Sequence, residues 1–267
     1  MNRGILLFAL GLVLASLNLS HAAITGQWDF NADYSPTIGQ EMYPLDPDTG
    51  AATAFGTTTS FGIPNIAGAE ARVMRFPKTP IDFGGYRVPS GAAPNGGGFA
   101  VNQYTIIMDV LFPAASSSKR RALIDTDYAQ DAEFFVQANN GIGSGTVSDG
   151  TIQPDTWHRI VFAVDLAATP SVLDKYIDGV KVGTQSLGAL DSIHAFYDTL
   201  YLIRDDNDET ELGYINSLQI RDEKLSDGLI AALNRILDIT VAETRAQGGT
   251  SVVPGHGRLY DEADVAE

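Results

Sequence analysis

The strongest constraint on the fold of this chain is a change of hydrophobic period near residue 220. Residues 214–221 alternate with a period of two, which predicts a strand with one buried face. The apolar side chains of residues 229–233 then recur on one side of a short helix. Ser226 and Asp227 stand where a helix needs an N-cap. The chain therefore predicts a last strand followed by a helix of one or two turns that closes against the sheet.

The rest of the chain, from about residue 24 to residue 220, is a series of short period-two runs separated by Gly, Pro, Asn and Asp. This pattern is typical of two stacked antiparallel sheets. Asp178-Gly179 suits a two-residue hairpin turn, because both positions tolerate positive φ, and residues 139–141 mark another hairpin. Five side chains are expected to lie mostly in the core: Trp28, Phe30, Trp157, Phe162 and Ile220.

Four segments occur in the order found in a known family. They are residues 28–31, with their Trp and Phe, residues 155–165, which include Trp157, residues 173–183 with the Asp-Gly turn, and the closing block 211–233. Together they resemble laminin-G-like, concanavalin A-like jelly-roll domains over about residues 24 to 235. The resemblance implies an all-β fold, a two-sheet antiparallel jelly-roll sandwich with a short C-terminal helix.

The N-terminus has the features of an export signal. Arg3 precedes an apolar run over residues 5–19, and Ser20-His21-Ala22 supplies small residues at the two positions that a signal peptidase reads. At about 15 residues the run is short for a membrane span, which needs about 20. We therefore expect a signal peptide at 1–22, no membrane span after its removal, and a secreted protein, periplasmic or extracellular. A retained N-terminal anchor is the alternative.

Charge and cysteine content limit the partners and the sources of stability. The chain has 33 acidic and 17 basic residues and no cysteine. Loss of Arg3 with the leader leaves 16 basic residues and a formal net charge of 16 − 33 = −17. This charge argues against a nucleic-acid partner, which needs a basic stripe. Disulfides cannot stabilise the domain, so sheet packing must do so, with or without a metal.

One acidic turn is the candidate metal site. Asp205, Asp206 and Asp208 lie within the run Asp-Asp-Asn-Asp-Glu at residues 205–209, between two predicted strands. Calcium takes six to eight oxygen ligands and is abundant outside cells, so these three side chains are the predicted calcium ligands. A solvated acidic turn is the alternative. Residues 46–50 and 125–127 give weaker versions of the same signal.

The tail, residues 236–267, resembles a different family. Its Pro254-Gly-His256-Gly segment is similar to one in metallo-β-lactamase-fold hydrolases, where the histidine is a zinc ligand. Catalytic zinc needs three or more convergent ligands, and the His-x-His-x-Asp-His cluster of that family is missing here. We expect His256 to bind no catalytic zinc, and the tail to lie outside the sandwich.

No catalytic set stands out in the domain at 23–235. His158 and Asp165 lie seven residues apart on opposite faces of one strand, which makes a poor acid–base pair. The basic cluster at residues 119–121 is predicted to be a solvated turn, or else a docking place for an anionic ligand. The favoured function is a secreted recognition module that binds a glycan or an extracellular protein through its rim loops. A polysaccharide hydrolase or lyase on the same sandwich is the alternative, and a remnant of a zinc metallo-hydrolase is the second alternative.

Overall fold

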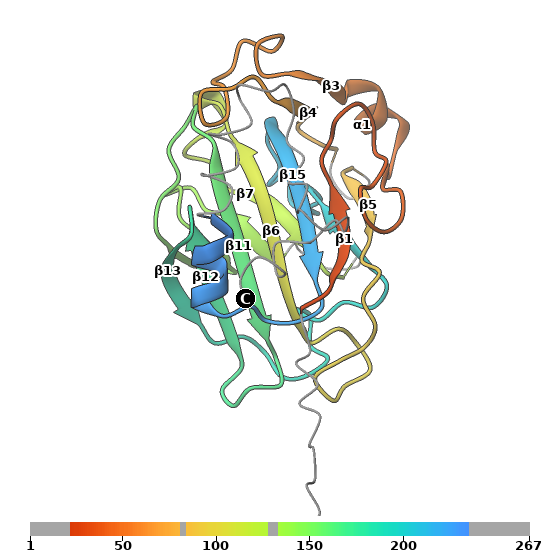
Figure 1. Ribbon diagram of the computed structural model, residues 1–267, viewed down its shortest axis with the longest axis vertical. Coiled ribbons are helices and arrows are strands. Elements are labelled where there is room, and N and C mark those ends of the chain that lie inside the picture. The colour runs from red at the N-terminus through yellow and green to blue at the C-terminus, as the bar shows by residue number, and fades with distance from the viewer. Residues whose placement is uncertain (1–21, 81–83, 128–132, 235–267) are drawn as a thin grey trace, which may run out of the picture.

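The computed structural model describes residues 22–80, 84–127 and 133–234. Within these residues the chain forms two stacked antiparallel sheets, one of eight strands and one of seven (Figure 1). The strands are β1 (Ile24–Trp28), β2 (Tyr43–Pro44), β3 (Ala54–Thr57), β4 (Arg72–Phe76), β5 (Tyr86–Pro89), β6 (Gln103–Leu111), β7 (Arg121–Asp125), β8 (Phe134–Val136), β9 (Ile142–Ser144), β10 (Val147–Asp149), β11 (His158–Asp165), β12 (Val172–Ile177), β13 (Val180–Gln185), β14 (Thr199–Leu202) and β15 (Gly213–Arg221). Two short helices, α1 (Pro47–Ala52) and η1 (Ala114–Ser116), lie in the connections. The predicted two-sheet antiparallel jelly-roll sandwich is confirmed.

The strand order shows that the chain crosses repeatedly between the two sheets. The eight-stranded sheet has the order β13-β12-β11-β6-β15-β4-β3, with β1 also paired to β15. The seven-stranded sheet has the order β10-β9-β8-β7-β14-β5-β2. Strands far apart in sequence, such as β1 and β15, therefore become neighbours. The eight-stranded sheet faces the viewer in Figure 1, and the seven-stranded sheet lies behind it.

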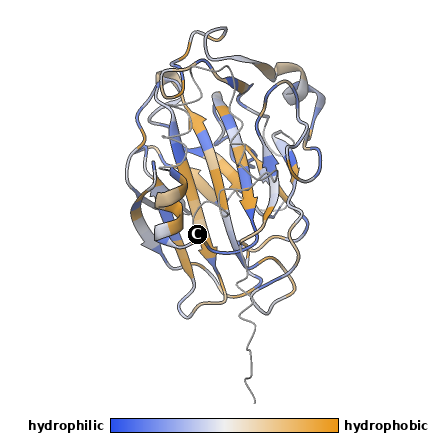
Figure 2. Ribbon diagram, viewed as in Figure 1, coloured by the Kyte–Doolittle hydropathy of each residue, from blue (hydrophilic) through white to orange (hydrophobic). Residues whose placement is uncertain are grey.

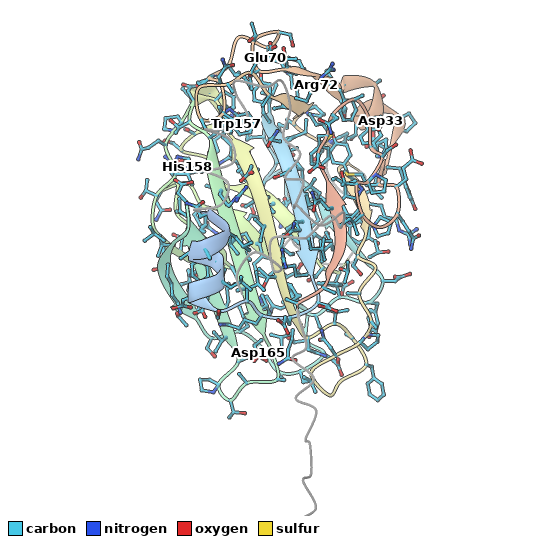
Figure 3. All side chains as sticks on the ribbon, viewed as in Figure 1. Asp33, Glu70, Arg72, Trp157, His158 and Asp165 are labelled. Atoms are coloured by element: carbon cyan, nitrogen blue, oxygen red, sulfur yellow. The ribbon has the colours of Figure 1, made fainter. Side chains whose placement is uncertain are left out.

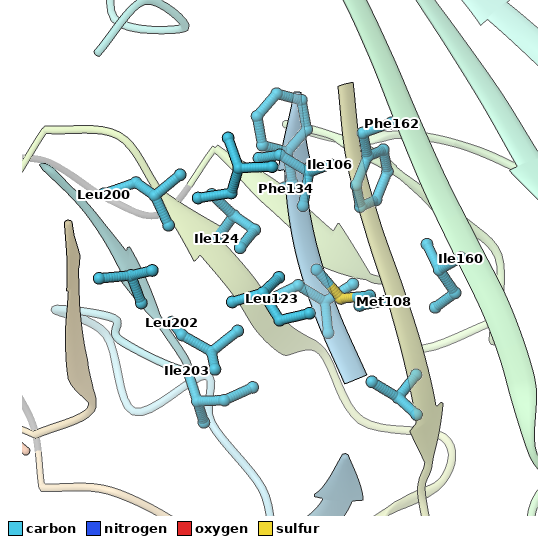
Figure 4. Close-up of a cluster of buried hydrophobic side chains, with 14 of the residues drawn as sticks. Ile106, Met108, Leu123, Ile124, Phe134, Ile160, Phe162, Leu200, Leu202 and Ile203 are labelled. Carbon is cyan, nitrogen blue, oxygen red and sulfur yellow. The ribbon is translucent and has the colours of Figure 1, made fainter. Parts of the chain in front are cut away.

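The core fills the space between the sheets. Strands β6 and β11 pair in register, with Ile106 opposite Phe162 and Met108 opposite Ile160. All four side chains are fully buried and meet side chains from β7, β8 and β14 (Figure 4). Three of them, the two isoleucines and the phenylalanine, are β-branched or aromatic, which suits a buried pleated surface, and hydrophobic residues predominate along β6 and β11 (Figure 2). Stability without disulfides rests on this layer.

Four of the five predicted core residues are buried: Trp28, Phe30, Phe162 and Ile220. The prediction is wrong for Trp157, which is partly exposed and packs in a separate cluster with Val73, Leu111 and Tyr214. Its indole N–H donates to the carbonyl of Pro64 at 2.8 Å. Trp157 immediately precedes β11, so it lies beyond the regular alternation of the strand, under the loop that connects β3 to β4.

Strand β15 departs from the uniform alternation that its sequence suggests. Its register shifts between Ile215 and Ser217, which is the signature of a β-bulge. The bulge turns Ile215, Leu218 and Ile220 toward the same core, although Ile215 differs in parity from the other two. A strand predicted to have one buried face thus changes face along its length.

The hairpin between β12 and β13 follows the predicted turn chemistry. Asp178 and Gly179 have φ of 52° and 77°, and Ile177 pairs with Val180 across the turn. Positive φ at both central residues is the requirement of a type I′ turn. Asn140, in the second predicted hairpin, has φ of 63° and lies between β8 and β9. Both hairpin predictions are confirmed.

Residues 227–234 form the predicted C-terminal helix, which lies over β11 and β12 (Figure 1). The Ser226 hydroxyl accepts a hydrogen bond from the Leu229 N–H at 3.3 Å, as an N-cap does. Ile230 and Leu233 are buried in a cluster on the outer face of the eight-stranded sheet, with Ile107, Val161, Ala163 and Tyr176. The helix thereby covers one face of the sandwich.

Residues 1–21 of the predicted leader at 1–22, and the tail with His256, lie outside the described residues. Of the described helices, none is both long and apolar enough to cross a membrane. The signal peptide, the secreted location and the dispensable tail stay predictions.

Candidate binding groove on the seven-stranded sheet

The outer face of the seven-stranded sheet presents a row of polar and aromatic side chains. Along β5 and β14, Tyr86, Val88, Leu200 and Leu202 point into the core. The intervening Arg87 and Tyr201 therefore point outward, since successive side chains of a strand alternate. The register places Tyr43 opposite Arg87, Arg87 opposite Tyr201, and Tyr201 opposite Asp125. One row thus crosses β2, β5, β14 and β7.

Arg87 is held in place by hydroxyl groups from both neighbouring strands. Its Nη1 donates to the Tyr43 hydroxyl at 2.7 Å. Its Nε and Nη2 donate to Thr199 Oγ1 at 3.3 and 3.1 Å. The guanidinium carbon lies 5.8 Å from the centre of the Tyr43 ring, which is within the range of a cation–π contact. The three side chains form a fixed unit at the surface.

A groove of about 710 Å³ opens beside this unit. It is lined by Gln40, Glu41, Tyr43, Arg87, Pro89, Gly91, Ala92, Asp198 and Thr199. Its size falls within the range of about 300–1,000 Å³ that is usual for small-ligand sites. Gly91 has φ of 65°, and a Cβ there would lie 2.5 Å from the Thr25 carbonyl oxygen, so the wall of the groove requires glycine at this position.

The groove combines hydrogen-bonding side chains with the partly exposed ring of Tyr43. Gln40, Glu41 and Asp198 provide side-chain carbonyl and carboxylate oxygens, and Arg87 provides N–H groups. Tyr43 is 43% exposed, so part of its ring is open to a ligand. A ligand with several hydroxyl groups and an apolar face meets partners of both kinds here.

Beyond Tyr201, the row continues into a buried charged cluster. Arg204 Nη1 donates to Asp125 Oδ2, and both side chains are closed to solvent. Burial raises the pKa of Asp125 to about 7, although Arg204 opposes the shift. Burial likewise raises the pKa of Glu133 to about 8, and the nearby Asp125 adds to it. Perturbed acids of this kind occur at active sites and in structural clusters. Their exposed fractions of 0% and 2% separate them from the groove.

The three predicted calcium ligands differ in burial and in hydrogen-bond partners. Asp205 is buried, and its Oδ2 accepts hydrogen bonds from the backbone N–H groups of Asn207 and Glu209 at 2.7 and 2.9 Å. Asp208 is exposed and pairs with Lys78 at 2.9 Å. Asp205 Oδ1 and Asp206 Oδ1 are buried oxygens that have no hydrogen-bond partner within the described ranges. Two such oxygens fall short of the six to eight that calcium takes.

Across the described ranges, no group of three or more acidic, histidine or cysteine side chains is placed to hold a metal ion. Calcium binding at residues 205–208 therefore stays a prediction. The weaker acidic signals have other roles. Asp46 caps α1 by accepting from the N–H groups of Asp48 and Thr49. Asp125 Oδ1 accepts from the Asp127 N–H at 2.8 Å.

The prediction of a solvated basic turn is wrong for Arg121. This side chain is 1% exposed and donates to Asn140 Oδ1 at 2.6 Å and to the Gln137 carbonyl at 3.3 Å. Arg120 lies with its guanidinium carbon 3.6 Å from the centre of the Phe135 ring. Arginine stems and guanidinium planes pack well on aromatic rings, and both arginines do so here, Arg121 on the ring of Phe112.

The histidine of β11 has a structural role. His158 and Asp165 lie at opposite ends of this strand (Figure 3), as the sequence predicts for a pair that does not cooperate. His158 Nδ1 instead lies 2.7 Å from Asp178 Oδ2. His158 Nε2 accepts from the Gln153 N–H at 2.9 Å. Both ring nitrogens are therefore engaged in fixing the ends of β11 and β12.

Sequence reasoning missed the groove. Arg87 stands between the apolar residues Tyr86 and Val88, and this pattern is the local signal of an outward-facing charge on a strand. The partners of Arg87 are distant in sequence, with 44 residues to Tyr43 and 112 to Thr199. No local pattern indicates that these side chains meet.

Two stacked antiparallel sheets in this order, closed by a C-terminal helix, form a jelly-roll sandwich. Residues 99–231 match the family model described as the concanavalin A-like lectin/glucanases superfamily. This match confirms the predicted resemblance over residues 99–231. A search of the curated proteins finds no match.

Similar solved structures agree on the fold. One is domain 4 of AbnA, a GH43 extracellular arabinanase from Geobacillus stearothermophilus, in complex with arabinotriose. It is 19% identical, covers 79% of this chain and 97% of that chain, and has a TM-score of 0.51. Another is the botulinum neurotoxin type G receptor-binding domain, which is 12% identical, covers 81% of this chain and has a TM-score of 0.50. The match spans 51% of that domain's length. At these identities the likeness concerns the fold.

Proposed function

We propose that this domain is a carbohydrate-binding module that takes part of a glycan chain in the groove beside Arg87. The observation that carries the proposal is the fixed unit of Tyr43, Arg87 and Thr199 on the outer face of the seven-stranded sheet. The three side chains of this unit are already ordered before a ligand binds, so little side-chain entropy is lost on binding. The sheet supplies rigidity, and the neighbouring loops supply Gln40, Glu41 and Asp198.

The groove matches the two kinds of surface that a sugar ring presents. The C–H faces of a pyranose or furanose ring pack against aromatic rings, which offer a large rigid contact at low entropic cost. The hydroxyl groups of the ring both donate and accept, and the groove has acceptors in Glu41 and Asp198 and donors in Arg87. One similar domain was solved in complex with arabinotriose, which is in keeping with this use of the fold.

The burial of the acids with raised pKa values favours a binding module over a hydrolase or lyase. Besides a carboxylate that acts as nucleophile or base, a polysaccharide hydrolase needs a general acid with a raised pKa that reaches the scissile bond. Asp125 and Glu133, the acids with raised pKa values near this face, are closed off by the surrounding chain. We therefore propose a binding module in preference to a hydrolase or lyase.

The proposal extends to location and to calcium. The predicted leader exports the protein to the periplasm or the medium, where glycans are accessible. Calcium assistance by Asp205, Asp206 and Asp208 remains part of the proposal. Asp205 Oδ1 and Asp206 Oδ1 have no hydrogen-bond partner, which supports it, while the ion pair of Asp208 with Lys78 opposes it.

A glycan array probed with the mature protein tests the proposal. We expect binding that Tyr43→Ala weakens about tenfold or more, a loss of about 1.4 kcal/mol or more. Tyr197→Ala is the matched control, because Tyr197 is 65% exposed but does not line the groove. Each array is run in millimolar calcium and in chelator. An array without any glycan hit, or equal losses in the two tyrosine variants, would overturn the groove proposal. Equal binding in both buffers would remove calcium alone.

A further inference from the structure

We infer that the sugar bound in the groove carries a carboxylate, which Arg87 receives through its two terminal nitrogens. The inference rests on the proposed function and specifies its ligand as a glycan with an acidic sugar residue. It follows from the donor count of Arg87, from its charge environment and from the two acids on the groove walls.

The donor count leaves two N–H groups of Arg87 for a ligand. A guanidinium has five N–H donors in a planar fork. The Nε–H and one Nη2–H are directed to Thr199 Oγ1, and one Nη1–H is directed to the Tyr43 hydroxyl. One N–H therefore remains on each terminal nitrogen. The two N–H groups on the neighbouring terminal nitrogens can each donate to one oxygen of a carboxylate.

The charge of Arg87 has no carboxylate partner within ion-pair distance in the described part of the chain. Several other arginines of the sandwich do have one: Arg120 pairs with Glu209, Arg159 with Asp109, and Arg204 with Asp125. Arg87 is bound by neutral hydroxyl groups and is part of the groove. Charge-assisted hydrogen bonds are about twice as strong as neutral ones. A carboxylate ligand therefore gains more at Arg87 than a hydroxyl group does.

The walls of the groove limit the ligand to few negative charges. Glu41 and Asp198 are exposed acids that line the same groove. They accept hydrogen bonds from sugar hydroxyls, but they repel a second carboxylate placed beside them. The net charge of −16 on the whole chain acts in the same direction. The favoured ligand is thus an isolated uronic acid on an otherwise neutral chain, and a densely charged polyuronate is disfavoured.

Three small probes test the inference by titration calorimetry. They are methyl β-glucuronoside, its methyl ester, and methyl β-glucoside, which differ at the carboxylate position alone. We expect the acid to bind at least about tenfold more tightly than either neutral probe. This preference should fall as sodium chloride rises from 50 to 500 mM, because salt screens exposed charge pairs.

Variants of Arg87 separate charge from geometry. Arg87→Gln is expected to bring the three affinities within about twofold of one another. Arg87→Lys retains the charge but loses the fork, so it should keep part of the preference. Arg72→Gln is the matched control, since Arg72 is an exposed arginine on β4 of the other sheet. Unchanged unfolding midpoints show that each variant is folded.

The outcomes distinguish this inference from the proposal on which it rests. Equal binding of acid and ester, or a preference that survives in Arg87→Gln, overturns the inference and leaves glycan binding intact. The same holds if no probe binds while the array shows neutral glycans. An empty array together with silent titrations overturns both. A preference for the acid that is lost in Arg87→Gln and kept in Arg72→Gln supports the inference.

Discussion

Glu133 shows how burial determines the protonation of a single side chain. Its Oε2 accepts from the Thr126 N–H at 2.6 Å, while its Oε1 is buried and has no hydrogen-bond partner among the described residues. Burial raises the pKa of Glu133 to about 8, well above the value of about 4.3 for the unfolded chain. The folded protein therefore holds a proton there that the unfolded chain releases between about pH 4.3 and 8.

This difference predicts that Glu133 lowers stability as the pH rises. Its contribution is fully present below about pH 4.3 and is lost as the pH rises toward 8, at up to about 1.4 kcal/mol per pH unit. Glu133→Gln, which mimics the protonated acid, should match the wild type at pH 4 and exceed it in unfolding free energy at pH 8. Denaturant unfolding at pH 4, 6 and 8 measures this, with the exposed Glu41→Gln as control. A constant difference between wild type and Glu133→Gln would contradict it.

Other single residues show which side chains the sequence can place. Trp28 and Phe162 lie on regular strands, and alternation predicted their burial correctly. Trp157 lies one residue before its strand, and Arg121 is buried against Phe112 and Asn140. Neither position follows from local polarity. Tertiary contacts decide both, and these depend on pairing between strands that are distant in sequence.

At the scale of elements, turns and caps are local and were predictable. Asp178-Gly179 and the Ser226 cap require a few neighbouring residues and lie where the sequence placed them. The bulge between Ile215 and Ser217 was not predicted, because it depends on how β15 pairs with β6. The two-residue β2 was also missed, although its Tyr43 forms part of the groove.

The C-terminal helix gives a prediction at this scale. Deleting residues 240–267 should leave the melting temperature within a few degrees, because the deletion removes none of the described strands. Deleting 227–267 should lower it further, since Ile230 and Leu233 then leave Val161 and Tyr176 uncovered, and each lost apolar side chain costs about 1.5–3 kcal/mol. Thermal unfolding of both truncations measures the contrast. Equal midpoints for the two truncations would contradict the assignment of the helix to the domain. Loss of folded protein on deleting residues 240–267 would contradict the placement of the tail outside the domain.

At the scale of the whole molecule, the two outer faces of the sandwich differ. The helix at 227–234 and the β3–β4 connection cover apolar clusters on the eight-stranded sheet, on the side that faces the viewer in Figure 1. The seven-stranded sheet exposes the row from Tyr43 to Tyr201 on its outer face. Covering one face leaves the other for a ligand, and that asymmetry positions the groove.

The sandwich class was predictable from period-two runs and turn residues, because these properties are local. The location of the site on the second sheet was not, since it results from the crossing of the chain between sheets. Rim loops were the predicted binding surface, and the groove combines such loops, at residues 40–41 and 91–92, with the sheet residues Arg87 and Thr199.

The central claim is that the groove beside Arg87 binds a glycan. Mapping of amide chemical shifts during titration with a glycan from the array tests it most directly. If the glycan occupies the groove, the largest changes should fall on residues 40–43, 87–92 and 198–201, and in Tyr43→Ala they should require about tenfold more glycan or more. Changes centred on the β12–β13 hairpin, on the acidic turn at 205–209 or on the face covered by the C-terminal helix would contradict it.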